Sequence, residues 1–362
     1  MSARPWIIDA TQDRVFLFGG VAASAALTLA ILVSGELAPW WWVWVIALDG
    51  PHLFATLART YLDPAEWQAR GGLLRGSLLW FLAGPAFLGL AAISGSGLPV
   101  ALFLTAASLW AWWHVLRQHL GFVGLYARVS GETDAGDAAW DRAALYTGML
   151  APFVAFALGH PQARPMLGLT GTPTWEPVVA AILWGLTAAV SLGWGLRVLS
   201  ARRAGRASSG PKVAYLALVL AWTAIVLSPP IANRLPIGGI TIAVTAWHNV
   251  QYHALVWHYK RNRYRTEPAA HGWAAVVGRS FLTYALVGIA FTLAYRLPNC
   301  GFGSPPGCAT GTTPLFAGLS LPVIGETLFW GFALHHYFVD QYIWRPSRDT
   351  RLRADLRLVA AG

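Results

Sequence analysis

Long apolar runs separated by short polar connections are the feature that most constrains how this chain folds. Crossing the hydrocarbon core of a bilayer takes a helix of about 20 mostly apolar residues. Ten such runs are present, at residues 15–34, 40–61, 73–94, 98–126, 142–160, 176–200, 212–231, 237–260, 273–296 and 315–344. They predict an all-α fold: a polytopic integral membrane helical bundle of about ten transmembrane helices, forming one transmembrane domain over residues 1–362.

The composition supports a membrane protein and argues against a nucleic-acid partner. Hydrophobic residues make up 56% of the chain and charged residues only 12%, whereas about a quarter of the residues of a soluble domain are charged. The net charge is +10, but the Arg and Lys residues stand in short clusters at the ends of the apolar runs. That placement is typical of topology signals and of contacts with anionic headgroups of a lipid bilayer, so no nucleic acid is expected.

The basic clusters also predict the orientation, because cytoplasmic loops carry an excess of Lys and Arg. With a cytoplasmic N-terminus, the loops on the cytoplasmic side hold Arg70, Arg75, Arg128, Arg142, Arg202, Arg203, Arg206, Lys212, Lys260, Arg261, Arg263 and Arg265. The opposite loops hold little beyond Arg164, Arg234 and Arg296. Both termini are therefore expected in the cytoplasm, with the chain in the inner (cytoplasmic) membrane of a bacterium.

The two cysteines, Cys300 and Cys308, lie in a Gly/Pro-rich loop on the predicted outer side. The compartment outside a bacterial inner membrane is oxidising. A disulfide within this loop is therefore expected in preference to two unpaired thiols.

Four of the apolar runs carry histidines together with other polar side chains, in the segments Asp49–Tyr61, Trp112–Gly121, Thr245–Arg265 and Leu334–Arg345. Such side chains are costly at membrane depth and by default mark a functional site. In the predicted topology all four helices run from the outside to the cytoplasm. One histidine of each lies seven or nine residues before a cytoplasmic cation, or roughly 10–14 Å from that flank. Imidazoles at similar depth on four helices predict that the segments converge on one site.

Spacing within two of these segments brings carboxylates close to imidazoles. Asp49 and His52 share a helix face, and a carboxylate beside an imidazole suits either a direct metal ligand or a partner that fixes the tautomer. His336 and Asp340 stand at i,i+4 and can jointly hold a cation or form a hydrogen bond.

The pairs His114/His119 and His248/His253 are spaced by five residues, which places them about 140° apart around a regular helix. Both members of a pair reach one centre only through a π-bulge, a feature frequent at functional sites. Otherwise one histidine of each pair faces the site and the other faces a neighbouring helix.

The candidate metal ligands are therefore His52, His114, His119, His248, His253, His335, His336 and Asp340. The candidate catalytic residues are Asp49, Asp340, Gln118 and Asn249. The remaining histidines, His160, His258 and His271, fall near helix ends and are expected to be interfacial.

A cluster of imidazoles with a few carboxylates and no thiolate prefers iron or manganese among the transition metals. The spaced pairs His114…His119 and His248…His253, with the adjacent His335-His336, loosely resemble the motifs of integral-membrane histidine-motif di-iron enzymes, the fatty-acid desaturase and hydroxylase type. The resemblance implies a transition metal, iron first, in a mononuclear or dinuclear centre.

The predicted function is that of a metal-dependent membrane oxidoreductase, of hydroxylase, desaturase or oxygenase type, that acts on a lipophilic small-molecule substrate in lipid metabolism. Electrons would come from a cytoplasmic donor docked on the basic loops, because the chain carries no flavin or iron–sulfur motif. Two alternatives stay open. One is a haem-binding electron-transfer protein with haem b between paired histidines, and the other is a proton- or ion-coupled transporter.

Overall fold

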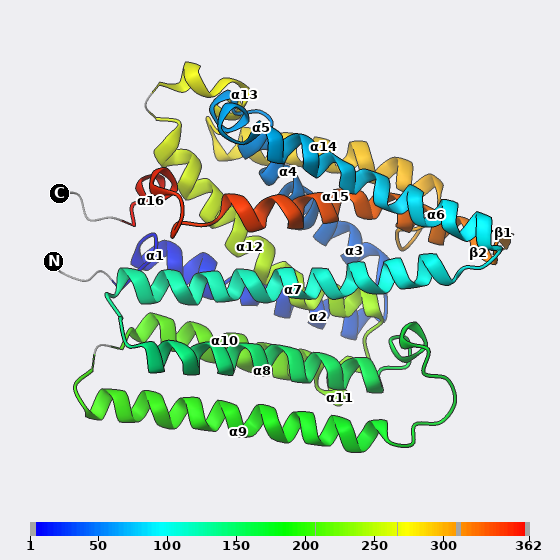
Figure 1. The fold of residues 1–362 in the computed structure, drawn as a ribbon, viewed down its shortest axis with the longest axis horizontal. Helices are drawn as coiled ribbons and strands as arrows, with labels where there is room; N and C mark the ends of the chain where they lie inside the picture. The colour runs from blue at the N-terminus through cyan, green and yellow to red at the C-terminus, as the bar shows by residue number, and fades with distance from the viewer. Residues whose placement is uncertain (1–4, 207, 266, 309–312, 359–362) are drawn as a thin grey trace. The chain divides into compact units, whose positions relative to one another are not determined.

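A computed structural model describes residues 5–206, 208–265, 267–308 and 313–358, and nearly all of their regular structure is helical (Figure 1). Within those residues, seven helices are long and apolar enough to cross a membrane: Ala10–Ser34, Pro64–Ser94, Leu98–Val129, Ala135–Gly159, Glu176–Arg203, Gly210–Leu227 and Phe281–Gly301. The all-α prediction is confirmed, and these helices support an integral membrane protein. A total of ten spans and two cytoplasmic termini stay predictions.

The chain divides into two compact units. The first contains Met1–Gly35 and Trp113–His248, and the second contains Glu36–Trp112 and Asn249–Val359. The long helices α7 (Leu98–Val129) and α12 (Ile237–Arg263) each contribute one part to each unit. The single domain expected from the sequence stays a prediction.

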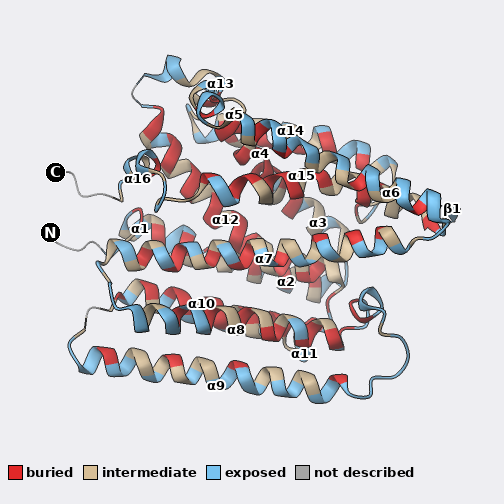
Figure 2. Ribbon diagram, in the orientation of Figure 1, coloured by how far each residue is buried: buried red, intermediate tan, exposed pale blue. Residues whose placement is uncertain are grey.

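The first unit is built from long, roughly parallel helices. Its elements are α1 (Ala10–Gln12), the π-helical turn η1 (Asp13–Phe18), α2 (Val21–Ser34), the second part of α7, α8 (Ala135–Gly159), the 3₁₀ turn η4 (Arg164–Leu167), α9 (Glu176–Arg203), α10 (Gly210–Leu227), α11 (Pro229–Ala232) and the first part of α12. Helix α8 packs against both α9 and α10 (Figure 1). Few residues of helix α9 are buried (Figure 2), as expected of a helix that faces lipid.

The second unit carries the shorter and more irregular elements. They are α3 (Ala38–Trp44), the π-helical turn η2 (Val45–Asp49), α4 (Gly50–Thr60), α5 (Pro64–Ser77), the 3₁₀ turn η3 (Leu78–Leu82), α6 (Ala83–Ser94), the first part of α7, the second part of α12, the 3₁₀ turn η5 (Pro268–His271), α13 (Gly272–Val277), α14 (Phe281–Gly301), β1 (Pro314–Phe316), β2 (Leu319–Ser320), α15 (Leu321–Ile343) and α16 (Thr350–Asp355). Buried residues concentrate on α4, α12 and α15 (Figure 2). These helices carry most of the candidate site residues.

Two glycines let α4 and α14 approach each other closely. A Cβ atom added to Gly50 would lie 2.0 Å from Thr292 Oγ1, and one added to Gly288 would lie 2.9 Å from Pro51 Cβ. Small residues at such crossings are how membrane helices pack closely. The contact holds the start of α4, which carries His52, against α14.

Asp349 caps the short helix α16, outside the predicted spans. Its carboxylate accepts a hydrogen bond from Leu352 N at 2.9 Å and pairs with the Arg70 guanidinium. Burial raises the pKa of the Asp349 carboxyl, but the Leu352 N–H and Arg70 together lower it further, so the pKa lies below its ordinary value of 3.8.

The segment before the last long helix differs from the predicted helix, whereas the predicted disulfide in the loop before it is confirmed. The predicted helix over 315–344 begins only at Leu321, because residues 314–320 form a two-stranded hairpin that turns at Gly318, where φ is 73°. The positive φ suits glycine and stops a helix from starting earlier. Cys300 and Cys308 form a disulfide, as expected.

Candidate metal centre

The closest pair of candidate ligands is His52 on α4 and His336 on α15, both in the second unit. Their Nε2 atoms lie 2.7 Å apart, and the two side chains are only 2% and 1% exposed. The residues are separated by 284 positions in the chain. Two of the predicted segments therefore bring their imidazoles together in an edge-on arrangement, with ring planes 69° apart.

Thr56, one turn after His52, joins this pair to a carboxylate. Its hydroxyl lies 2.7 Å from His336 Nδ1 and donates to Asp340 Oδ1 at 2.7 Å. His336 Nδ1 is 3.7 Å from the same carboxylate oxygen, so the hydroxyl bridges a gap too long for a direct hydrogen bond. The expected i,i+4 partnership of His336 and Asp340 is present, and it runs through Thr56.

Tyr252 on α12 completes the cluster. Its hydroxyl lies 2.7 Å from Thr56 Oγ1 and donates to Asp340 Oδ1 at 3.0 Å, while Trp344 Nε1 donates to that hydroxyl at 3.2 Å. Every one of these groups is buried or nearly so. This set of hydrogen bonds offsets the free-energy cost of burying the Asp340 carboxylate in an apolar interior.

Asp49 and Asn249, both candidate catalytic residues, meet each other at a separate position in the second unit. The Asn249 side chain hydrogen-bonds the Asp49 carboxylate, and Arg296 on α14 lies 3.5 Å from Asp49 Oδ2. The sequence predicts Arg296 in an external loop, whereas in the structure it lies within α14. As an ion-pair partner it gives Asp49 a structural contact, and the catalytic role of Asp49 stays a prediction.

His253 and His335, both predicted ligands, contact other groups. His253 Nδ1 lies 2.7 Å from Tyr284 OH and its Nε2 lies 3.0 Å from the Leu48 carbonyl, although its ring centroid is 6.2 Å from that of His52. His335 Nε2 lies 2.9 Å from Tyr61 OH. The adjacent residues His335 and His336 point about 100° apart on α15, which is why only His336 meets His52.

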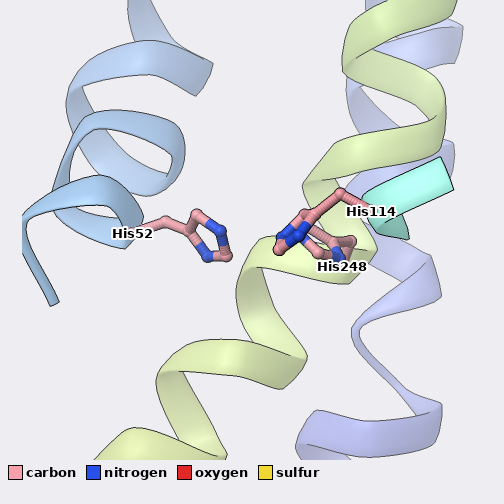
Figure 3. Close-up of side chains that lie close together, drawn as sticks. All are labelled: His52, His114 and His248. Atoms are coloured by element: carbon pink, nitrogen blue, oxygen red, sulfur yellow. The ribbon is translucent and has the colours of Figure 1, made fainter. Parts of the chain in front are cut away.

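A second pair of imidazoles lies in the first unit. The rings of His114 on α7 and His248 on α12 have centroids 5.1 Å apart in an edge-on arrangement, and Figure 3 shows these two rings close together. Gln118, which shares a face with His114, donates from Nε2 to the His248 carbonyl at 2.9 Å. The candidates His114, His248 and Gln118 thus belong to one cluster. A single centre joining all four predicted segments stays a prediction.

One arrangement that the five-residue spacing allows is a π-bulge. Neither α7 nor α12 contains one, because both are regular α-helices throughout their described residues. His119 therefore turns away from His114. Its Nδ1 lies 2.7 Å from Tyr215 OH and its ring packs on Trp247 at 5.2 Å. His253 turns away from His248 for the same reason. One histidine of each pair contacts a neighbouring helix, the second of the two arrangements expected from the sequence.

Residues that the sequence analysis missed are Tyr252 and Arg59. Tyr252 lies within the histidine segment of α12, and a buried tyrosine hydroxyl needs a partner, which is a signal the sequence carries. Arg59 is 1% exposed and stacks over Trp344 at 3.7 Å, while its NH2 donates to the Ile343 carbonyl. It anchors the end of α15 beside the His52–His336 pair.

His160, expected to be interfacial, is buried and contacts the Leu235 carbonyl at 3.0 Å.

Comparisons with family models, with curated proteins and with solved structures find no match to this chain. Its function is therefore inferred from the chemistry of the buried clusters.

Proposed function

We propose that the protein is a metal-dependent integral membrane oxidoreductase, of hydroxylase, desaturase or oxygenase type, acting on a lipophilic substrate. The observation that carries the proposal is the buried pair of Nε2 atoms of His52 and His336, 2.7 Å apart and backed by Thr56 and Asp340. With a metal, the two Nε2 atoms would be two of its ligands. Without a metal, they share a single hydrogen bond.

The hydrogen bonds behind His336 determine which of its nitrogens carries the proton. Because the Thr56 hydroxyl donates its only hydrogen to Asp340, it accepts from His336 Nδ1–H. His336 Nε2 is then left with a lone pair directed at His52. A histidine whose Nδ1–H is held by an oxygen network is the usual form of a metal-ligating imidazole.

The distance between the two Nε2 atoms suits adjacent ligands on one ion. Metal–imidazole bonds of about 2.0–2.1 Å put two neighbouring ligand nitrogens roughly 3 Å apart. The observed Nε2–Nε2 distance of 2.7 Å would have to widen by a few tenths of an ångström for both atoms to bind one ion. Two axial ligands of a haem lie on opposite sides of the iron, about 4 Å apart at the same bond length, so this pair favours a non-haem ion.

Iron fits the neighbouring groups best, because imidazoles with a carboxylate in reach favour iron or manganese over softer metals. His52 and His336 would hold the ion, with Asp340 as a third ligand or as the group that orients His336 through Thr56. A redox-active ion held there would supply the activation of oxygen for hydroxylation, desaturation or oxidative cleavage. The apolar helices around the cluster exclude water from it.

The membrane setting indicates the kind of substrate and the source of electrons. A site inside apolar helices receives an acyl, isoprenoid or carotenoid chain directly from the bilayer. In the proposed orientation, within a bacterial inner membrane, the basic ends of α12 and α9 lie on the cytoplasmic side. The basic end of α9 would attract an acidic electron donor.

The test is metal analysis of the purified protein together with its absorption spectrum. We expect one or two equivalents of a transition metal, iron first, without a Soret band. His52→Ala and His336→Ala should each remove most of that metal, whereas His160→Ala, which deletes an equally buried histidine in the first unit, should retain it. Stoichiometric haem, or full metal content in both site variants, contradicts the proposal.

A proton-coupled carrier is the second candidate, and one observation favours it. The side chains of His52, His336, Thr56 and Asp340 form an unbroken chain of hydrogen bonds, which is the arrangement that moves protons through a membrane interior. A metal-free protein whose transport activity follows histidine titration would identify this function instead.

A further inference from the structure

A large cavity lies in the second unit, away from the histidine clusters. It measures about 910 Å³ and is lined by residues between Trp257 and Arg279, from the end of α12 through η5 and α13. Its lining combines cations with aromatic and small apolar side chains, a mixture that suits an amphiphile with a charged head.

The charge of the cavity is entirely positive. Four of its thirteen lining residues are cations, Lys260, Arg261, Arg265 and Arg279, and none of the thirteen is an Asp or Glu. The nearby carboxylates Asp63 and Asp355 pair with Arg263, which does not line the cavity. The cavity therefore offers three exposed guanidinium groups, with the buried Lys260 beside them, to an anion from outside the chain.

Lys260 gives the strongest indication of a ligand. It is only 1% exposed, and among the described residues no hydrogen-bond acceptor lies within reach of its Nζ, which sits over the Tyr284 ring at 4.3 Å. A buried ammonium without a hydrogen-bond acceptor is costly. Because this Nζ atom is itself buried, an anion in the cavity supplies the missing acceptor once the lysine side chain turns toward the cavity.

The apolar part of the lining leads to the membrane surface. Trp273 is 70% exposed, and Trp257 and Val276 line the same cavity. Arg279 stands two residues before Phe281, where the candidate membrane span α14 begins. Tryptophan and arginine at the end of a span are typical of the headgroup region of a bilayer.

We propose that this cavity binds an anionic phospholipid, with its phosphate among Lys260, Arg265 and Arg279 and the start of its acyl chains along Trp257 and Trp273. The recess is concave, and its apolar wall continues toward the lipid-facing surface of α14. These features favour a lipid over an acidic protein partner, for which a flatter polar surface would suffice. The inference is independent of the metal centre.

The experiment uses full-length protein in a neutral detergent and native mass spectrometry to count bound lipids. The probes are phosphatidylglycerol and phosphatidylcholine with identical acyl chains. A cation near a membrane surface changes the affinity for an anionic lipid by roughly fivefold. Arg265→Gln combined with Arg279→Gln should therefore weaken phosphatidylglycerol binding by about 25-fold. The matched control, Arg202→Gln combined with Arg203→Gln, removes two exposed cations at the end of α9 and should leave binding unchanged.

Lys260→Met separates ligand binding from folding. Because the variant removes a buried charge that lacks an acceptor, we expect an equal or higher melting temperature together with weaker binding of phosphatidylglycerol. A lower melting temperature with unchanged lipid binding would make Lys260 structural and overturn the assignment.

Four further outcomes would also overturn the proposal. Phosphatidylcholine could bind as tightly as phosphatidylglycerol, or both double variants could weaken binding equally, which would mean unspecific attraction. Millimolar inorganic phosphate could displace the lipid, which would indicate a site for a soluble anion. An acidic protein fragment that displaces the lipid would identify a protein partner in its place.

Discussion

Replacing Thr56 with Val tests the network behind His336 most sharply. The two side chains have nearly the same shape, so the substitution removes a hydroxyl without creating a cavity. That hydroxyl contacts His336 Nδ1, Asp340 Oδ1 and Tyr252 OH, each at 2.7 Å. Each buried hydrogen bond contributes about 1 kcal/mol. Because the Tyr252 hydrogen goes to Asp340, two of these three contacts are hydrogen bonds, and the free energy of unfolding should fall by about 2 kcal/mol.

The effect on metal binding is the more specific part of this prediction. Without the Thr56 hydroxyl, the His336 imidazole loses the group that orients it and sets its tautomer. Removing such a partner typically lowers metal affinity by about 10–100-fold. The assay is a titration of the bound metal against a chelator of known affinity, alongside chemical unfolding in detergent.

The control lies one turn further along the same helix. Thr60 is as buried as Thr56, but its hydroxyl donates only to the Thr56 carbonyl. Thr60→Val should cost about 1 kcal/mol of stability and leave the chelator titration unchanged. If Thr56→Val gives the same chelator curve as the unsubstituted protein, the hydrogen-bond network has no part in holding a metal, and the reasoning is refuted.

Three further predictions concern the fold. Gly50→Ala should lower the free energy of unfolding by about 1–3 kcal/mol, because the new Cβ would overlap Thr292, and the melting temperature measures this. Asp349→Asn should destabilise the protein at neutral pH, where the carboxylate is charged. Because the folded pKa is depressed, the difference between the two proteins should vanish as the pH falls through that pKa in a pH series of unfolding curves. After reduction, a membrane-impermeant maleimide should label Cys300 and Cys308 from the outside of intact cells.

Each of these predictions has its own control. Gly71→Ala, at a glycine with nothing within 4 Å of the added Cβ, should leave the melting temperature unchanged or raise it. The depressed pKa would be contradicted if the free energies of unfolding of Asp349→Asn and the parent protein still differed at strongly acidic pH. Labelling only after the membrane is opened would reverse the predicted orientation of the loop.

The long helices were predictable from the sequence because apolar runs of sufficient length have few other structures available in a membrane. Three of the predicted segments, 40–61, 237–260 and 315–344, are helical over most of their length, yet they are not among the seven candidate spans. Their polar site residues lower the hydropathy of these segments. The π-helical turns at Asp13–Phe18 and Val45–Asp49 were not foreseen, since no residue pattern distinguishes them from an α-helix.

The site was predictable in its residue types and only in part in its contacts. The i,i+4 spacing placed His336 beside Asp340, a local relation that a helix enforces. The contact of His52 with His336 and the position of Tyr252 depend on how α4, α12 and α15 pack, which no spacing along one helix reveals. His119 and His335 contact tyrosines instead, because a regular helix directs neighbouring histidines to different sides.

X-ray absorption spectroscopy of the purified protein at the edge of its bound metal tests the central claim most directly. The account predicts a non-haem ion with at least two imidazole ligands at about 2.0–2.1 Å, and a loss of imidazole scattering in His336→Ala. A protein without a metal, or a spectrum dominated by porphyrin nitrogens, would contradict it.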